Sequence, residues 1–159
     1  MKPFIAVIGG RNSGKSTVIS SLTGCPTHRF RNFVVDLASS HSIFVIASSP
    51  QEDPLTSARL TRILNQVTAD SDCLGIVIAI QPTKPYSRLS IEQIFTAVQN
   101  THEYNIHAFS LDPGYNGAQG STAALQTRLN PLGVHLNQLS AQRFAFASAA
   151  DINISTRLI

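Results

Sequence analysis

The sequence predicts an α/β domain in which helices cover both faces of a mostly parallel β-sheet. Three largely apolar runs, at residues 3–8, 74–80 and 106–111, have the length and composition of buried parallel strands. The stretches between them are long enough to hold the crossover helices that parallel pairing requires. We therefore expect a three-layer sandwich with one antiparallel edge strand, formed as a single domain over residues 1–159.

The first elements follow from the apolar runs and the glycines that bound them. Residues 3–8 predict a buried strand, which enters a Gly-rich loop, and residues 15–23 predict a helix that ends at Gly24. Residues 31–37 and 42–48 are two β-rich runs separated by a short polar turn, which favours a hairpin. That hairpin supplies the expected antiparallel edge strand.

Two further helices are predicted from their start signals. Asp53 followed by Pro54 is typical of a helix start, with aspartate as N-cap and proline in the first turn. Ser90 and Gln93 predict a capping box at the start of the next helix. Each start precedes an apolar stripe at helical spacing. The stripes are Leu60, Ile63, Leu64 and Val67 in the first helix, and Ile91, Ile94, Phe95 and Val98 in the second.

The last third of the chain is less clearly patterned. The strand at 106–111 leads into a loop at 112–117 that is dense in turn residues, and a short helix is expected near 119–129. Residues 138–150 are compatible with helix or strand, and the pattern does not decide between them.

Composition restricts the classes of partner. The chain is 43% hydrophobic and 13% charged with a formal net charge of +3, which indicates a compact globule whose surface a protein partner could partly cover. The basic residues do not cluster beside aromatic platforms, which argues against nucleic acid. No apolar run approaches the ~20 residues of a bilayer span, so we expect no transmembrane segment and a cytoplasmic location.

The segment at residues 9–16 matches the pattern GxxxxGK[ST] of a phosphate-binding P-loop. A predicted strand precedes it and a predicted helix follows it, as the mechanism requires. Its glycines let backbone N–H groups face phosphate oxygens, and the helix N-terminus adds partial positive charge. Lys15 is expected to reach the β- and γ-phosphates, Ser16 to bind Mg²⁺, and Thr17 to contact the α-phosphate or cap the helix. The residues predicted to bind nucleotide are Gly9, Arg11, Asn12, Ser13, Gly14, Lys15, Ser16 and Thr17.

This strand–loop–helix unit resembles the P-loop NTPase superfamily, and the order of elements from Phe4 to Val98 is similar to that of the Ras-like small GTPases. The resemblance implies a nucleotide, ATP or GTP, bound with Mg²⁺. It also implies roles for two single residues. Thr27 stands in the segment of the family's metal-binding switch threonine, and Gln51 falls at the position of its water-positioning glutamine.

The second motif of that family is degenerate in this chain. Ala47 stands where the family has a magnesium-side aspartate, and Pro50 stands where it has a glycine whose N–H contacts the γ-phosphate. Proline has no N–H to donate. The family's [NT]KxD motif for guanine does not occur in the sequence, so the base remains open between adenine and guanine.

Two other acids are candidates for the missing carboxylate. Asp36 and Asp112 each close a β-rich run, and ligands gather at the carboxyl ends of strands in open α/β sheets. We expect Asp36 to serve as a metal ligand and Asp112 as a catalytic acid; the alternative for Asp112 is the first position of a turn. An arginine that contacts phosphate could be supplied by any of four positions: Arg11, Arg29, Arg31 and Arg128.

Three functions therefore remain open. The first is a Ras-like switch or weak NTPase, in which Lys15, Gln51 and Asp112 act on the nucleotide and Ser16, Thr27 and Asp36 hold Mg²⁺. The second is a non-catalytic interaction module that keeps the P-loop fold. The third is a small-molecule or nucleotide kinase.

Overall fold

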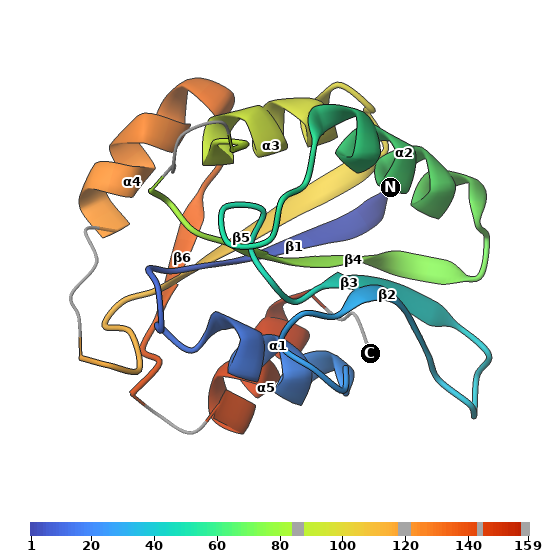
Figure 1. Cartoon of the computed structure of the whole chain (residues 1–159), viewed down its shortest axis with the longest axis horizontal. Coiled ribbons are helices and arrows are strands. Elements are labelled where there is room, and N and C mark those ends of the chain that lie inside the picture. The colour runs from blue at the N-terminus through green and yellow to red at the C-terminus, as the bar shows by residue number, and fades with distance from the viewer. Residues whose placement is uncertain (84–87, 118–121, 143–144, 157–159) are drawn as a thin grey trace.

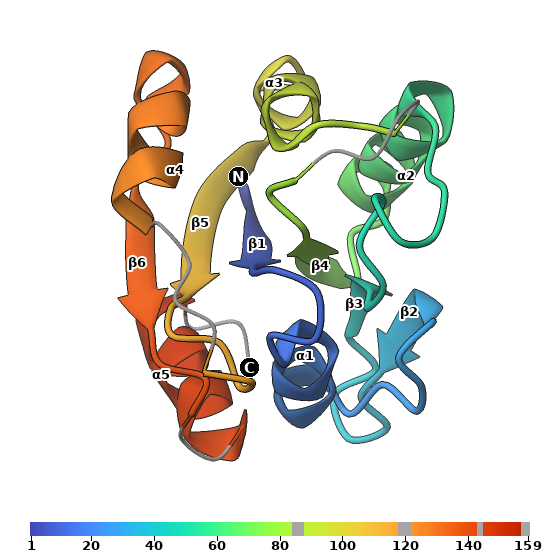
Figure 2. The same cartoon turned by 60° about the vertical axis from the view of Figure 1, so that its left-hand side comes forward.

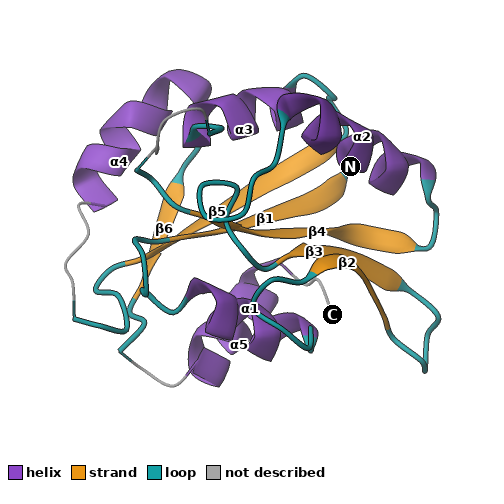
Figure 3. Cartoon of the chain, in the orientation of Figure 1, coloured by secondary structure: helices purple, strands orange, loops and turns teal. Residues whose placement is uncertain are grey.

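A computed structural model of the chain describes residues 1–83, 88–117, 122–142 and 145–156. In these residues a six-stranded sheet lies between two layers of helices (Figures 1 and 3). The strands are β1 (Lys2–Ile8), β2 (Arg31–Val35), β3 (Ser42–Ile46), β4 (Cys73–Ile80), β5 (Tyr104–Leu111) and β6 (Leu136–Leu139). The α-helices are α1 (Lys15–Thr23), α2 (Ser57–Ala69), α3 (Ile91–Gln99), α4 (Thr122–Leu129) and α5 (Ala145–Thr156). The predicted α/β class is confirmed.

The strand order across the sheet is β2-β3-β4-β1-β5-β6, which places β1 near the centre. β2 pairs antiparallel with β3, and the other neighbouring pairs are parallel. The hairpin and its antiparallel edge strand are therefore confirmed. Because the five parallel strands point the same way, the loops after them meet at one edge of the sheet.

Helices α1 and α5 pack together on one face of the sheet, and α2, α3 and α4 cover the other (Figures 1 and 2). Side chains along β1 point alternately toward the two helical layers and pack in the core on each face of the sheet. Phe4 and Ile8 belong to the core beneath α2 and α3, whereas Ile5 and Val7 belong to the core shared with α1 and α5. All four side chains are fully buried, which explains why this strand is a continuous apolar run.

The start of α2 corrects one prediction. The expected Asp53 N-cap is not used, because Asp53 forms an ion pair with Arg31 of β2 at 3.1 Å. Thr56 caps the helix instead, and its side chain accepts a hydrogen bond from the N–H of Arg59 at 3.2 Å. At α3 the predicted capping box of Ser90 and Gln93 is confirmed.

The undecided segment at residues 138–150 contains the end of a strand and the start of a helix. β6 ends within it, at Leu139, and α5 begins within it, at Ala145. The helix predicted near 119–129 begins at Thr122 as described, and residues 118–121 lie outside the described part of the chain.

Candidate functional site

The loop at residues 9–14 joins the central strand β1 to α1 and has little room for other side chains. A β-carbon on Gly9 would collide with the Oγ of Ser13, so a larger residue here would force the Ser13 side chain to move. Gly14 caps α1 with φ at 94°, a conformation that favours glycine. The loop therefore turns tightly enough to direct the amino end of α1 toward the space above it.

Lys15 begins α1 and is buried, with 4% of its surface exposed. Its Nζ donates a hydrogen bond to the carbonyl oxygen of Gly10 at 2.7 Å. Among the described residues it forms no ion pair. Burial lowers the pKa of the Lys15 ammonium from its ordinary value, and the charge of nearby Glu52 acts in the opposite direction. A buried ammonium without a bound carboxylate is well suited to pair with an anion.

Ser13 carries a second unsatisfied group of the same loop. Its side chain is 4% exposed, and its Oγ makes no hydrogen bond within the described residues. A buried hydroxyl without a partner costs about 1–3 kcal/mol. Ser13 is one of the residues that line the pocket described next, so a small shift of its side chain would let a polar ligand there satisfy the hydroxyl.

A pocket of about 1730 Å³ opens over the loop and the first turn of α1. Its walls come from the segments that follow β1, β3, β4, β5 and β6, together with His28 and Arg29 before β2. Each of the predicted binding residues from Arg11 to Thr17 lines it. Ser16 lies in the same wall, and its Oγ donates to the carbonyl oxygen of Ala47 at 2.8 Å. The pocket thus lies at the carboxyl edge of the sheet, where ligands bind in open α/β folds.

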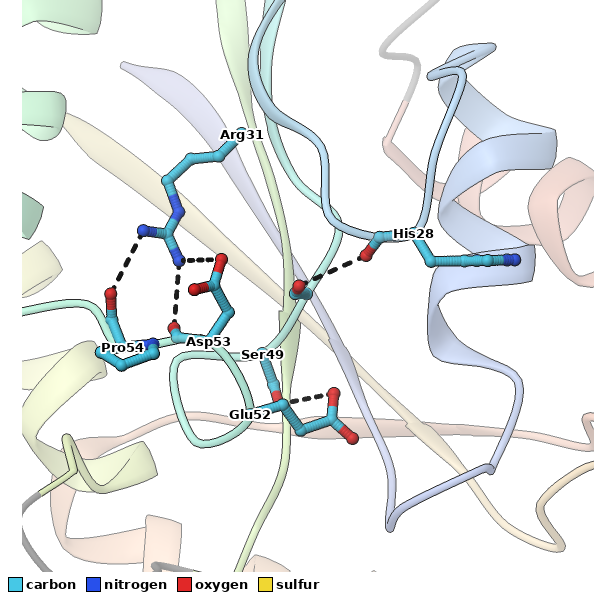
Figure 4. A network of polar contacts seen from close by, with 7 residues as sticks. His28, Arg31, Ser49, Glu52, Asp53 and Pro54 are labelled. Carbon is cyan, nitrogen blue, oxygen red and sulfur yellow. Dashed lines mark hydrogen bonds and ion pairs between the residues drawn. The ribbon is translucent and has the colours of Figure 1, made fainter.

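The wall after β3 is held by a network of polar contacts (Figure 4). Arg31 donates to both Asp53 and the carbonyl oxygen of Pro54, at 3.0–3.3 Å. Ser49 donates to the carboxylate of Glu52 at 3.1 Å. Glu52 therefore has a defined place in the pocket wall, near enough to Lys15 to influence its pKa.

Gln51 also lines the pocket, but its carboxamide is engaged in the protein. Nε2 donates to the carbonyl oxygen of Leu89 at 2.6 Å, and Oε1 accepts from the N–H of Gln81 at 3.0 Å. The side chain is 4% exposed. These bonds tie the segment after β3 to that after β4, and they occupy the groups that would orient a water molecule.

The structure does not bring the predicted metal ligands Thr27 and Asp36 to the pocket wall beside Ser16. Asp36 lies in the β2–β3 turn, where its carboxylate accepts hydrogen bonds from Ala38 and Ser39. These bonds lower the pKa of Asp36. Because β2 runs antiparallel, its carboxyl end lies at the opposite edge of the sheet, roughly 16 Å from the end of β3 by the rise of five residues. Thr27 is exposed and does not line the pocket.

Asp112, predicted as a catalytic acid, has a structural contact instead. Its carboxylate accepts hydrogen bonds from the N–H and the hydroxyl of Thr122, at 3.2 and 2.7 Å, at the start of α4. It is not part of the pocket wall. Of the candidate arginines, Arg11 and Arg29 line the pocket, whereas Arg31 pairs with Asp53 and Arg128 with Glu92.

Sequence reasoning missed several residues of the pocket wall, among them Glu52, Tyr115 and Gln142. Glu52 directly precedes the helix start predicted at Asp53 and Pro54, although α2 begins only at Ser57. Tyr115 and Gln142 follow β5 and β6 and reach the pocket because β5 lies beside β1 and β6 lies beside β5. The signal that could have found them is position, since each lies within a few residues of a strand's carboxyl end.

No group of three or more metal-binding side chains is present in the described ranges. In the same residues no helix has the length and apolar character needed to cross a membrane. A scan against protein-family models found no match, and a search of curated proteins found no similar sequence.

Proposed function

We propose that this chain is a P-loop domain that binds a nucleoside diphosphate or triphosphate over the loop at residues 9–16. The observation that carries the proposal is the pair of buried, incompletely paired groups in that loop. Lys15 offers a positive charge and Ser13 an unsatisfied hydroxyl, and both line one pocket beside the amino end of α1. Phosphate oxygens would accept hydrogen bonds from both groups.

The proposal includes Mg²⁺ as a companion of the nucleotide. Ser16 and Glu52 line the same pocket, and a hydroxyl and a carboxylate are both ligands that Mg²⁺ accepts beside phosphate oxygens. Their chemistry is compatible with the ion, and we propose Ser16 and Glu52 as the groups that would hold it. A bound Mg²⁺ would neutralise charge on the β- and γ-phosphates.

Binding, and not a rapid Ras-like hydrolytic cycle, is the function that the site favours. The carboxamide of Gln51 is already hydrogen-bonded at both ends, and Pro50 has no N–H for a γ-phosphate. In addition, β4 separates β3 from β1, and the degenerate second motif meets the P-loop through the carbonyl oxygen of Ala47, which accepts from the Oγ of Ser16 at 2.8 Å, and not through a carboxylate. The resemblance to Ras-like domains is thus proposed only for the P-loop unit and the hairpin.

Isothermal titration calorimetry tests the proposal with ATP, ADP, GTP and GDP, each with and without Mg²⁺. We expect at least one nucleotide to bind, and Lys15→Ala to weaken that binding about 10- to 100-fold, because a charge-assisted hydrogen bond is lost. Arg62→Ala is the matched control, since it removes an equal charge from the exposed face of α2, away from the pocket. Nucleotide binding that is equal in wild type and Lys15→Ala would contradict the proposal, as would no binding at all.

A further inference from the structure

The pocket has two chemically different sides, separated by the central strand β1. The segments after β3 and β4 contribute polar and charged groups, among them Glu52 and Gln81. The segments after β5 and β6 contribute Tyr115, Gln142 and three alanines: Ala141, Ala145 and Ala147. The volume of about 1730 Å³ exceeds the ~300–1,000 Å³ of a typical small-molecule site, so a ligand bound at the P-loop has room to extend toward this second side.

The backbone of Tyr115 is held by a hydrogen bond, while its side chain is largely exposed. Its N–H donates to the carbonyl oxygen of Ser13 at 3.0 Å, and a β-carbon on Gly14 would lie 3.2 Å from its Cβ. The loop after β5 is thereby hydrogen-bonded to the P-loop. The residue nevertheless remains 73% exposed. An aromatic ring left open on a pocket wall can serve as a platform on which a planar base stacks.

Gln142 lies beside the same loop. The N–H of Ala141 donates to the carbonyl oxygen of Pro113 at 2.9 Å, which joins the loop after β6 to the loop after β5. The Nε2 of Gln142 lies 3.5 Å from where a β-carbon on Gly117 would stand. Its carboxamide therefore lies beside Gly117, two residues after Tyr115, and presents a donor and an acceptor side by side.

The polar groups on this side favour adenine over guanine. Adenine presents a donor next to an acceptor, which a carboxamide matches with two hydrogen bonds. A carboxamide can also pair with the O6 acceptor and the N1–H donor of guanine, but the exocyclic N2 amine of guanine is then left without an acceptor, a role that a carboxylate fills. None of the described residues that line this side is charged. The sequence also lacks the [NT]KxD motif that supplies a carboxylate for guanine.

We infer that the nucleotide held by the P-loop is an adenine nucleotide, with its base stacked on Tyr115 and recognised by the carboxamide of Gln142. The inference rests on the proposed function, because it places the base of the ligand whose phosphates Lys15 binds. The three alanines form the apolar floor beneath the base.

Calorimetry with ATP, GTP and inorganic tripolyphosphate separates base recognition from phosphate binding. Wild type should bind ATP about tenfold more tightly than GTP. Tyr115→Ala should weaken ATP about tenfold and leave tripolyphosphate unchanged, because only the ring is removed while the Cβ and backbone contacts with the P-loop stay. Tyr115→Phe keeps the stacking face and should bind ATP as wild type does. Gln142→Glu should reverse the preference in favour of GTP, since a carboxylate accepts from both guanine donors.

Three outcomes would overturn the inference. If GTP binds wild type as tightly as ATP while tripolyphosphate binding still requires Lys15, the adenine assignment fails and the proposed function stands. If Tyr115→Ala weakens tripolyphosphate as much as ATP, the ring supports the loop and not the base. If neither the nucleotides nor tripolyphosphate binds, the proposed function fails together with the inference.

Discussion

At the scale of single residues, the hydroxyl of Ser13 should affect ligand binding and folding stability in opposite directions. Its Oγ is buried without a partner among the described residues, so the hydroxyl costs folding free energy while no ligand is bound. We predict that Ser13→Ala raises the free energy of unfolding of the ligand-free protein by about 1 kcal/mol and weakens nucleotide binding about tenfold. Urea unfolding and calorimetry on the same preparation measure the two effects.

Ser20 provides the matched control, in the helix α1 that follows the loop of Ser13. Its Oγ already donates to the carbonyl oxygen of Cys25 at 2.8 Å, and it does not line the pocket. Ser20→Ala should therefore lower the free energy of unfolding by about 1 kcal/mol and leave nucleotide affinity unchanged. If Ser13→Ala behaves in the same way as Ser20→Ala, the Ser13 hydroxyl has no role in binding.

The positions of single residues were predictable where a local pattern determines them and not where the fold does. The pattern at residues 9–16 indicated Lys15 and Ser16, because spacing along a strand–loop–helix unit fixes their position. Asp36 was predicted at the edge of the sheet where the P-loop lies, and this was wrong. The β-rich residues before it resemble a parallel strand that ends in an acidic residue. Only the pairing direction of β2 shows where that end lies.

At the scale of elements, Lys2 joins β1 to the end of α2 and the start of β4. Its Nζ donates to the carbonyl oxygens of Val67 and Cys73, each at 2.7 Å, and to that of Asp70. The last turn of α2 has no basic residue of its own, so this ammonium satisfies its unpaired carbonyls and its negative dipole end. We predict that Lys2→Met lowers the free energy of unfolding by about 2 kcal/mol in urea titration.

The control for Lys2 is nucleotide affinity, which should not change because Lys2 does not line the pocket. Lys2→Arg keeps the charge and should recover part of the stability, although a planar guanidinium fits three converging carbonyls less well than an ammonium. An unfolding free energy equal to that of wild type in Lys2→Met would show that the three hydrogen bonds contribute nothing.

Strands and helices could be predicted where the residues within each element determine its structure. Buried strands and the Ser90 capping box depend on local sequence, and both were correct. The start of α2 was wrong because a partner from another element, Arg31, engages Asp53 and leaves Thr56 as the N-cap. β6 was undecided because it is a short edge strand in which Asn137 and Gln138 face solvent.

At the scale of the whole molecule, strand order creates the pocket. The order β2-β3-β4-β1-β5-β6 brings Glu52 to one side of the P-loop and Tyr115 and Gln142 to the other. Apolar runs predict that a parallel sheet forms, but they carry no information about which strands are neighbours. The second side of the pocket could not be predicted for that reason.

The free energy of unfolding should depend on pH through the protonation of Lys15. The unfolded chain holds this proton up to the ordinary lysine pKa of 10.5, whereas burial lowers the pKa in the folded protein. Between the two pKa values the unfolded state binds more protons, so the free energy of unfolding rises with pH in that window. Below the window both states are protonated, and this group adds no pH dependence.

The comparison of wild type with Lys15→Met isolates that dependence from the other groups that titrate in alkali. In ligand-free protein, the stability of wild type relative to Lys15→Met should increase as pH rises toward 10.5, because the buried charge disappears. Nucleotide affinity should fall over the same window, since the phosphates lose their cationic partner. Urea titrations and calorimetry across this range measure the two slopes. A difference in stability that does not vary with pH would show that the Lys15 ammonium is solvated as well in the folded protein as in the unfolded chain, and the argument from its burial would fail.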